Sequence, residues 1–146
     1  MAAKKERMEA ILRLINERPV ANHRELVEAL QGAGFEVTQA TVSRDLADLG
    51  LAKMRRDGAP VYVSADVEAL ARALGEFLVS AQAARNLVVL KTLPGAASRV
   101  GALVDKVGWE DIVGTVAGDD AIVVVALDDA RASALVERVA DLKRFK

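Results

Sequence analysis

Residues 38–50, T-Q-A-T-V-S-R-D-L-A-D-L-G, combine hydroxyl and guanidinium side chains at the spacing of one short helix. Val42, Leu46 and Leu49 fall at i, i+4 and i+7, so they form an apolar stripe that a core can bury. The opposite face is expected to carry Ala40, Thr41, Ser43, Arg44, Ala47 and Asp48. Its small residues allow close approach to a partner, and its polar groups suit base edges and phosphates. This is the pattern of a helix-turn-helix recognition helix, although an ordinary amphipathic surface helix fits it equally well.

The residues around this helix favour the recognition-helix interpretation. Thr38 is a good N-cap, and Gly50 suits the left-handed residue that ends a helix. Upstream, Asn22 and Glu25 resemble a capping box that opens a second helix, which ends at the two glycines 32 and 34. A first helix is predicted from apolar residues at helical spacing, Met8, Ile11, Leu12 and Ile15, and Pro19 closes that helix or its exit loop.

Two short strands, 51–55 and 61–63, are predicted after the recognition helix. They flank the segment R-D-G-A-P, in which Asp-Gly is a strong turn signal. Three helices followed by a hairpin is the order of a winged helix-turn-helix. The hairpin becomes the wing, with Lys53, Arg55 and Arg56 placed to reach phosphates, although basic residues on a hairpin often serve only solubility.

The charge of this first part is balanced. Residues 1–66 contain ten Lys and Arg and ten Asp and Glu, whereas residues 1–24 alone carry a net charge of plus three. A DNA-binding domain is often visibly basic, so sequence-independent DNA affinity is expected to be modest and strongly salt-dependent.

Composition excludes several classes of protein. A chain of 146 residues, 52% of them hydrophobic, allows one or two small domains with real cores. There is no cysteine, which rules out disulfides and thiolate metal sites, and the single His23 is more often structural than catalytic. No apolar run has the length of a membrane span and no signal-peptide core is found, so a soluble, cytoplasmic protein without a membrane partner is expected. Aromatic residues make up only 3%, which argues against stacking on single strands.

The second half of the sequence, residues 77–146, predicts an α+β domain with a mostly antiparallel sheet and two helices. A linker helix is expected over 67–76, interrupted at Gly75, and the segment 77–83 is compatible with strand or helix. Further on, strands are predicted at 86–93, 112–117 and 121–127, and helices at 96–107 and after Asp128 or Asp129. The predicted domains are therefore 1–66 and 77–146, joined by the linker helix.

The segment 114–120, G-T-V-A-G-D-D, places two adjacent acids, Asp119 and Asp120, in a tight turn between apolar strands. Two carboxylates there are costly unless something compensates them, and a solvated turn is the more common explanation of so short a motif. A metal is possible, but the chain has no His or Cys cluster beside the acids. A guanidinium is the better candidate, because its planar donors match paired carboxylates.

Taken together, three motifs resemble the bacterial arginine repressor family over essentially the whole chain. They are T-Q-A-T-V-S-R-D-L at 38–46, K-T-L-P-G-A-A at 91–97 and G-T-V-A-G-D-D at 114–120. The resemblance implies a winged helix-turn-helix followed by an oligomerisation and arginine-binding domain. Members of the family form trimers that pair into hexamers, with L-arginine bound where the trimers meet, and they bind palindromic operators of arginine metabolism genes. The resemblance also implies a strand at 77–83, no enzymatic activity, and no cofactor or metal besides the effector L-arginine.

The family's functional residues transfer by motif onto this sequence. In the DNA-reading helix, Ser43 and Arg44 match the Ser-Arg pair, and Gln39 and Thr41 lie beside it. In the second domain the matching ligand-binding positions are Ser98, Asp105, Thr115, Ala117, Asp119 and Asp120. The chain departs from the family at Ala121, where a Thr often follows the acids, and in its first domain, which has no net charge and is less basic than expected.

Three alternatives stay open at the level of sequence. A winged-helix regulator could respond to another amino acid or to a nucleotide. A small enzyme could use Asp119 and Asp120, although the chain lacks a nucleophile–base pair near them. Family members also act as accessory proteins in site-specific recombination, which needs the same DNA binding and the same oligomer.

Overall fold

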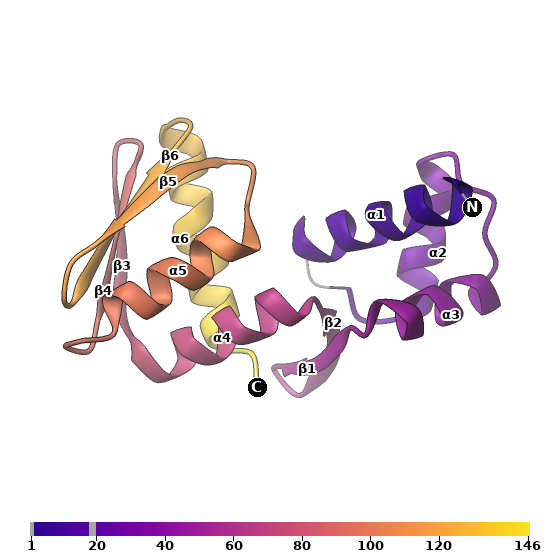
Figure 1. Ribbon diagram of the computed structural model, residues 1–146, viewed down its shortest axis with the longest axis horizontal. Helices are drawn as coiled ribbons and strands as arrows, with labels where there is room; N and C mark the ends of the chain where they lie inside the picture. The colour runs from indigo at the N-terminus through magenta and orange to yellow at the C-terminus, as the bar shows by residue number, and fades with distance from the viewer. Residues whose placement is uncertain (1, 18–19) are drawn as a thin grey trace. The chain divides into compact units, whose positions relative to one another are not determined.

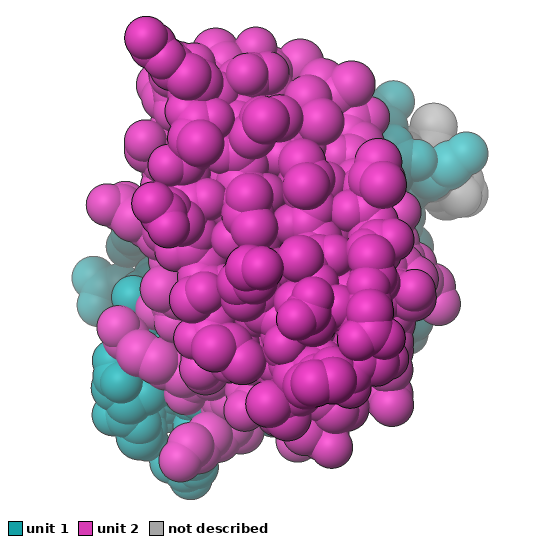
Figure 2. Space-filling view, turned by 90° about the vertical axis from the view of Figure 1, so that its left-hand side faces the viewer, with its two compact units in different colours: residues 1–68 teal, residues 69–146 magenta. Residues whose placement is uncertain are grey.

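A computed structural model describes residues 2–17 and 20–146 and separates the chain into two units, residues 1–68 and 69–146 (Figures 1 and 2). The predicted helix-closing Pro19 lies outside the described residues. Helix α4, Ala65–Phe77, crosses the boundary between the units and includes the predicted linker 67–76.

The first unit has the predicted winged helix-turn-helix order. It consists of α1 (Ala2–Glu17), α2 (His23–Gly32), α3 (Gln39–Leu49), β1 (Ala52–Arg56) and β2 (Ala59–Val63). The three helices share one apolar core, in which the predicted stripe of α3 takes part. Its buried side chains are Ile11, Ile15, Val20, Leu26, Leu30, Val37, Val42 and Leu46, and Leu49 packs against them.

The start of α2 and both ends of α3 are set by the predicted caps, whereas α2 includes Gly32 and has Ala33 as its C-cap. The side chain of Asn22 accepts a hydrogen bond from the Glu25 amide at 3.0 Å, whereas the Glu25 carboxylate reaches the amide of Ala21 rather than that of Asn22. Thr38 accepts from the Thr41 amide at 3.3 Å, and Gly50 ends α3 in the left-handed region with φ 61°. A residue with a side chain would be strained at that φ.

The wing is longer than predicted. Its strands pair as far as Arg56 and Ala59, so only Asp57 and Gly58 form the turn. Both have positive φ, 51° and 84°, which is the two-residue geometry that matches the twist of a hairpin. The predicted five-residue connection was therefore too long, because Arg56 is the last residue of β1 and Ala59 and Pro60 are the first residues of β2.

Two contacts of Tyr62 attach the wing to the segment before α2. The Tyr62 amide donates to the carbonyl of Val20 at 2.8 Å, and the Tyr62 hydroxyl lies 3.0 Å from Nε2 of His23. The single histidine of the chain thus has the structural role that its isolation indicated.

A buried ion pair joins α1 to α3. Asp45 is only 2% exposed, and both of its oxygens accept from the Arg7 guanidinium, with Nη2 to Oδ1 at 3.1 Å. The hydrogen bonds to Asp45 raise the pKa of Arg7 further above its ordinary value. Since a buried carboxylate without a partner is costly, this pair fixes where α1 lies against α3.

Helix α4 continues through Gly75, so the predicted interruption there was wrong. A single glycine inside a helix costs only about 1 kcal/mol relative to alanine, and burial of Leu70 and Leu74 on the same helix outweighs it. At its start, Ser64 accepts from the Val67 amide at 3.2 Å and donates to the side chain of Asn16 at 3.1 Å.

The second unit confirms the predicted α+β fold. Its strands β3 (Leu78–Ala84), β4 (Leu87–Thr92), β5 (Ile112–Ala117) and β6 (Ala121–Ala126) form one antiparallel sheet in the order β3-β4-β6-β5. The ambiguous segment at 77–83 is thus largely strand. Helices α5 (Ala97–Val107) and α6 (Asp129–Lys143) cover the same face of the sheet (Figure 1). The buried residues between these layers include Val88, Leu90, Val100, Val104, Ile122, Val124, Leu135 and Val139.

Polar contacts fix the start of α6 and attach α6 to the loop that follows α5. Asp128 caps α6 by accepting from the Arg131 amide at 2.8 Å, and this bond lowers the pKa of Asp128. Arg138 of α6 holds the loop after α5. Its guanidinium binds both oxygens of Asp111, at 3.2 and 3.0 Å, and lies 4.8 Å from the centre of the Trp109 ring. In the described part of the chain, no helix is long and apolar enough to cross a membrane.

We predict that Arg7→Met destabilises α3 within the intact chain. The substitution leaves Asp45 buried without a cation, which costs of the order of 3 kcal/mol, the lower end of the range for buried pairs, because Arg7 keeps some contact with water. Hydrogen–deuterium exchange of the α3 amides should accelerate by roughly a hundredfold. Arg13→Met, at an exposed position of the same helix, is the control. Equal exchange in both variants would contradict a positioning role for the ion pair.

Candidate nucleic-acid interface and ligand site

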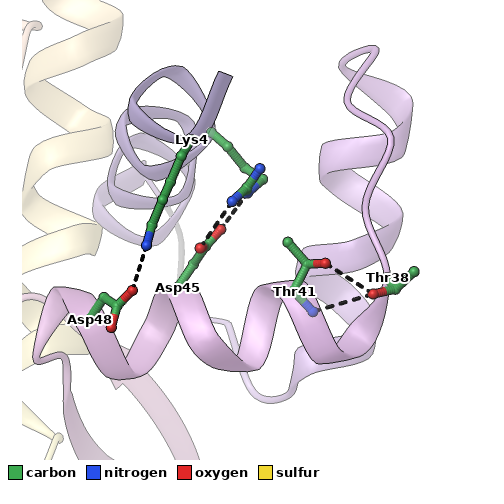
Figure 3. A network of polar contacts seen from close by, with 6 residues as sticks. Lys4, Thr38, Thr41, Asp45 and Asp48 are labelled. Atoms are coloured by element: carbon green, nitrogen blue, oxygen red, sulfur yellow. Dashed lines mark hydrogen bonds and ion pairs between the residues drawn. The ribbon is translucent and has the colours of Figure 1, made fainter. Parts of the chain in front are cut away.

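The exposed face of α3 carries most of the residues predicted to read DNA. Gln39, Ser43 and Arg44 are exposed, as are the small side chains at 40 and 47. Thr41 is only half-exposed, because it lies in the capping turn and its hydroxyl is 3.0 Å from that of Thr38 (Figure 3). The face therefore offers an amide, a hydroxyl and a guanidinium to a partner, with little bulk between them.

A groove beside this face is formed by side chains of α1 and α3. Lys4 Nζ binds Asp48 Oδ2 at 2.8 Å, one helical turn from the Arg7–Asp45 pair (Figure 3). The groove is lined by Lys4, Arg7, Thr41, Arg44, Asp45, Ala47 and Asp48. The hydrogen bond and the charge of Lys4, with a smaller contribution from the charge of Arg44, lower the pKa of Asp48. The groove thus brings three cations and two carboxylates together.

Sequence reasoning did not identify these α1 contacts. Asp45 falls on the inward stripe of α3, between Val42 and Leu46, and a carboxylate in such a place signals a buried partner. Nothing in the sequence indicates which cation that partner is, because Arg7 lies 38 residues away.

The basic residues of the wing make contacts within the hairpin that the sequence did not predict. The Arg55 side chain turns back and donates from Nη1 to the carbonyl of Gly58 at 2.7 Å, so it braces the turn. Lys53 Nζ lies 5.4 Å from the centre of the Tyr62 ring, and Arg56 is half-buried. Lys53 and Arg55 are nevertheless exposed.

In the second unit, the backbone of the Gly-Asp-Asp turn is bound to the 91–97 motif. The carbonyl of Asp119 accepts from the amides of Gly95 and Ala97 at 3.1 and 3.2 Å, and that of Asp120 accepts from Thr92 at 2.8 Å. The residue before α5 is an alanine that makes no side-chain cap, so the Asp119 carbonyl takes up an amide at this helix start. Two motifs far apart in sequence therefore form one rigid corner.

The predicted ligand residues on α5 and β5 face each other. Thr115 Oγ1 donates to Asp105 Oδ1 at 2.8 Å. Gly101 of α5 faces Ala117 of β5, where an added Cβ would make ordinary van der Waals contact at 3.4 Å. Ser98 is exposed on the first turn of α5.

The side chains of the Gly-Asp-Asp turn carry two adjacent negative charges. Asp119 and Asp120 are exposed, and within the described residues neither carboxylate has a hydrogen-bond or ion-pair partner. The structure thus holds two adjacent negative charges by their backbone and leaves their oxygens available. Two adjacent carboxylates of this kind suit a planar cation with several donors, whereas Asp105 lies near the other end of α5 beside Thr115.

The fold and the two sites define a class of protein: a winged-helix DNA-binding unit joined to a ligand-binding α+β unit. Comparison with known proteins identifies the family. Residues 2–69 match the family described as "Arginine repressor, DNA binding domain", and residues 74–141 match "Arginine repressor, C-terminal domain". The chain belongs to the arginine repressor family.

Curated relatives named "Arginine repressor" are similar over nearly the full length. The protein of Thermus thermophilus is 43% identical over 97% of this chain and 92% of its own. That of an Anaeromyxobacter species is 41% identical over the same shares, and that of Carboxydothermus hydrogenoformans is 39% identical over 90% of this chain and 93% of its own.

We predict that Arg44→Ala removes sequence preference while leaving the fold intact. A bidentate contact of arginine to guanine discriminates by about 1–3 kcal/mol per base pair, and Arg44 is the guanidinium at the centre of the exposed α3 face. Competition gel shifts with operator and unrelated duplexes measure the preference. Arg13→Ala, which removes the same charge elsewhere in the unit, should leave the ratio of the two affinities unchanged. An unaltered ratio in Arg44→Ala would mean that α3 does not read the bases.

Proposed function

We propose that the chain is an arginine-responsive transcriptional regulator that works in the cytoplasm, where bacterial DNA lies, and is not an enzyme. It binds palindromic operators of arginine metabolism genes as a homo-oligomer, with L-arginine as co-repressor. The observation that carries the proposal is the pair of available carboxylates, Asp119 and Asp120, held rigidly in the unit that matches the arginine repressor C-terminal domain.

Arginine suits this corner chemically. Its guanidinium has five N–H donors in a plane and stays charged at any physiological pH, so it can compensate two adjacent carboxylates at once. Asp105, near the other end of α5 and bound on one oxygen by Thr115, keeps its other oxygen for a further contact. A neutral amino-acid side chain would leave the charges of the two adjacent carboxylates uncompensated.

The open face of the sheet supports self-association. The helices of the second unit leave one face of the sheet uncovered, and Figure 2 views the molecule from that side. On this face Val116 pairs with Val123, which pairs with Val89, and Leu87 pairs with Val125. Val116 is 72% exposed in the single chain. An apolar sheet face of this kind needs a partner layer, and further copies of the chain supply it.

Oligomerisation also accounts for DNA affinity. A single winged unit makes few contacts, so several units linked in one assembly are needed to bind paired half-sites. We infer trimers built on the open sheet face that pair into hexamers, with arginine bound where the trimers meet. Arginine between subunits stabilises the assembled state, by about 2.7 kcal/mol per site at a hundredfold excess over Kd.

Asp120→Asn tests the effector. The substitution keeps the shape of the turn but removes one charge, and charge-assisted hydrogen bonds are about twice as strong as neutral ones. The variant should lose arginine-dependent assembly and arginine-dependent operator binding, as followed by sedimentation and gel shift, while it remains folded. Glu137→Gln on the exposed side of α6 is the charge-matched control.

Citrulline provides a second test of arginine binding, which uses the unaltered protein. It replaces the guanidinium by a neutral urea, so it should stabilise the protein against heat far less than arginine does. Equal thermal stabilisation by the two compounds would contradict binding of the guanidinium by the carboxylates.

Val116→Asp tests the role of the open sheet face. The aspartate is solvated in the single chain but buried without a partner in the assembly, at a cost of a few kcal/mol per interface. The sedimentation coefficient at micromolar concentration should fall to that of a monomer. Ala134→Asp, an exposed position on α6, should keep the assembly. If both variants sediment like the unaltered chain, the sheet face is not the subunit contact.

A further inference from the structure

The Lys4–Asp48 pair lies on the surface that DNA would meet. Asp48 follows Arg44 by one helical turn on the exposed face of α3, and the side chains of Lys4 and Asp48 are 49% and 50% exposed. The neighbouring Arg7–Asp45 pair is different, because Asp45 is 2% exposed and cannot exchange its partner for a ligand. The outer pair is therefore available for exchange, and the inner pair is structural.

A carboxylate on this face opposes DNA binding in two ways. It repels phosphates directly, and it occupies the ammonium group of Lys4, which could otherwise bind a phosphate. Arg44, by contrast, has no hydrogen bond or ion pair of its own within the described residues, so it is available to the DNA. Asp48 thus neutralises one of the two exposed cations that line the groove.

We propose that Asp48 is a brake on DNA affinity: it holds Lys4 in an ion pair beside the reading helix and so withholds a phosphate contact. This inference rests on the proposed DNA binding. The brake acts on the sequence-independent part of the affinity and leaves the preference carried by Arg44 unchanged. Its consequence is that unrelated DNA is bound weakly, so that operator occupancy depends on base contacts and on assembly.

Binding of operator and unrelated duplexes over a range of salt concentrations tests the brake in the full chain with saturating arginine. Asp48→Asn should bind both duplexes more tightly by a similar factor. The slope of log K against log salt should steepen by about 0.9 for each DNA-binding unit engaged, since each unit gains one phosphate contact. The gain in DNA affinity of Asp48→Asn over the unaltered protein should therefore shrink roughly threefold for each engaged unit as the salt concentration rises from about 50 to 200 mM.

Lys4 supplies the decisive comparison. In Asp48→Asn, the additional change Lys4→Gln should return the slope to that of the unaltered protein. Lys4→Gln alone should leave the slope unchanged, because Lys4 makes no phosphate contact while Asp48 holds it. Glu36→Gln, an exposed acid of the same unit outside α3, controls for the change in net charge and should not alter the slope.

Three results would overturn the proposal. One is an unchanged slope in Asp48→Asn, and another is a steeper slope that persists without Lys4. The third is a loss of preference at one base pair, which would make Asp48 a reader of cytosine instead. Failure of the unaltered protein to bind either duplex would refute the proposed function itself, and is thereby distinguished from failure of the brake.

Discussion

Burial of one carboxylate governs the arrangement of the first unit. Asp45 lies on the core side of the helix whose other side is exposed to a partner, so its charge must be satisfied by the protein itself. Arg7 meets that need with two hydrogen bonds and thereby fixes α1 against α3. The apolar core alone would tolerate some sliding of one helix along another, whereas a bidentate ion pair tolerates very little. The orientation of the exposed face of α3 consequently depends on a residue that does not belong to that helix.

The second unit solves a similar problem with backbone atoms. The carbonyl oxygens of Asp119 and Asp120 are used to hold the turn against the start of α5 and the end of β4, and the carboxylates of the same residues remain available. One pair of residues thus supplies both the scaffold and the chemistry of the site. The donors are backbone amides of the segment 91–97, so this segment is needed to hold the turn, whereas only proline at the donor positions would remove a bond.

The local features could be predicted from the sequence, and the contacts over long distances could not. Thr38, Gly50 and the Asp57-Gly58 turn act through neighbouring residues, so their types were enough to place them. The wing strands were predicted to stop at 55 and to resume at 61, whereas pairing across the hairpin extends them to Arg56 and Ala59. Gly75 was misjudged because burial of its helix outweighs its low propensity. Lys4 and Arg7 were missed, since each acts on a residue from another element.

The two units also differ in their optical properties, as a result of where the rare aromatic residues lie. The only tryptophan of the chain, Trp109, is 9% exposed and lies against the guanidinium of Arg138 in the second unit. The only tyrosine, Tyr62, lies in the wing and shares a hydrogen bond with His23. Excitation at the red edge of the absorption band selects the indole alone. Its emission therefore follows the ligand-binding unit without interference from the DNA-binding unit, and no label has to be introduced to observe the two separately.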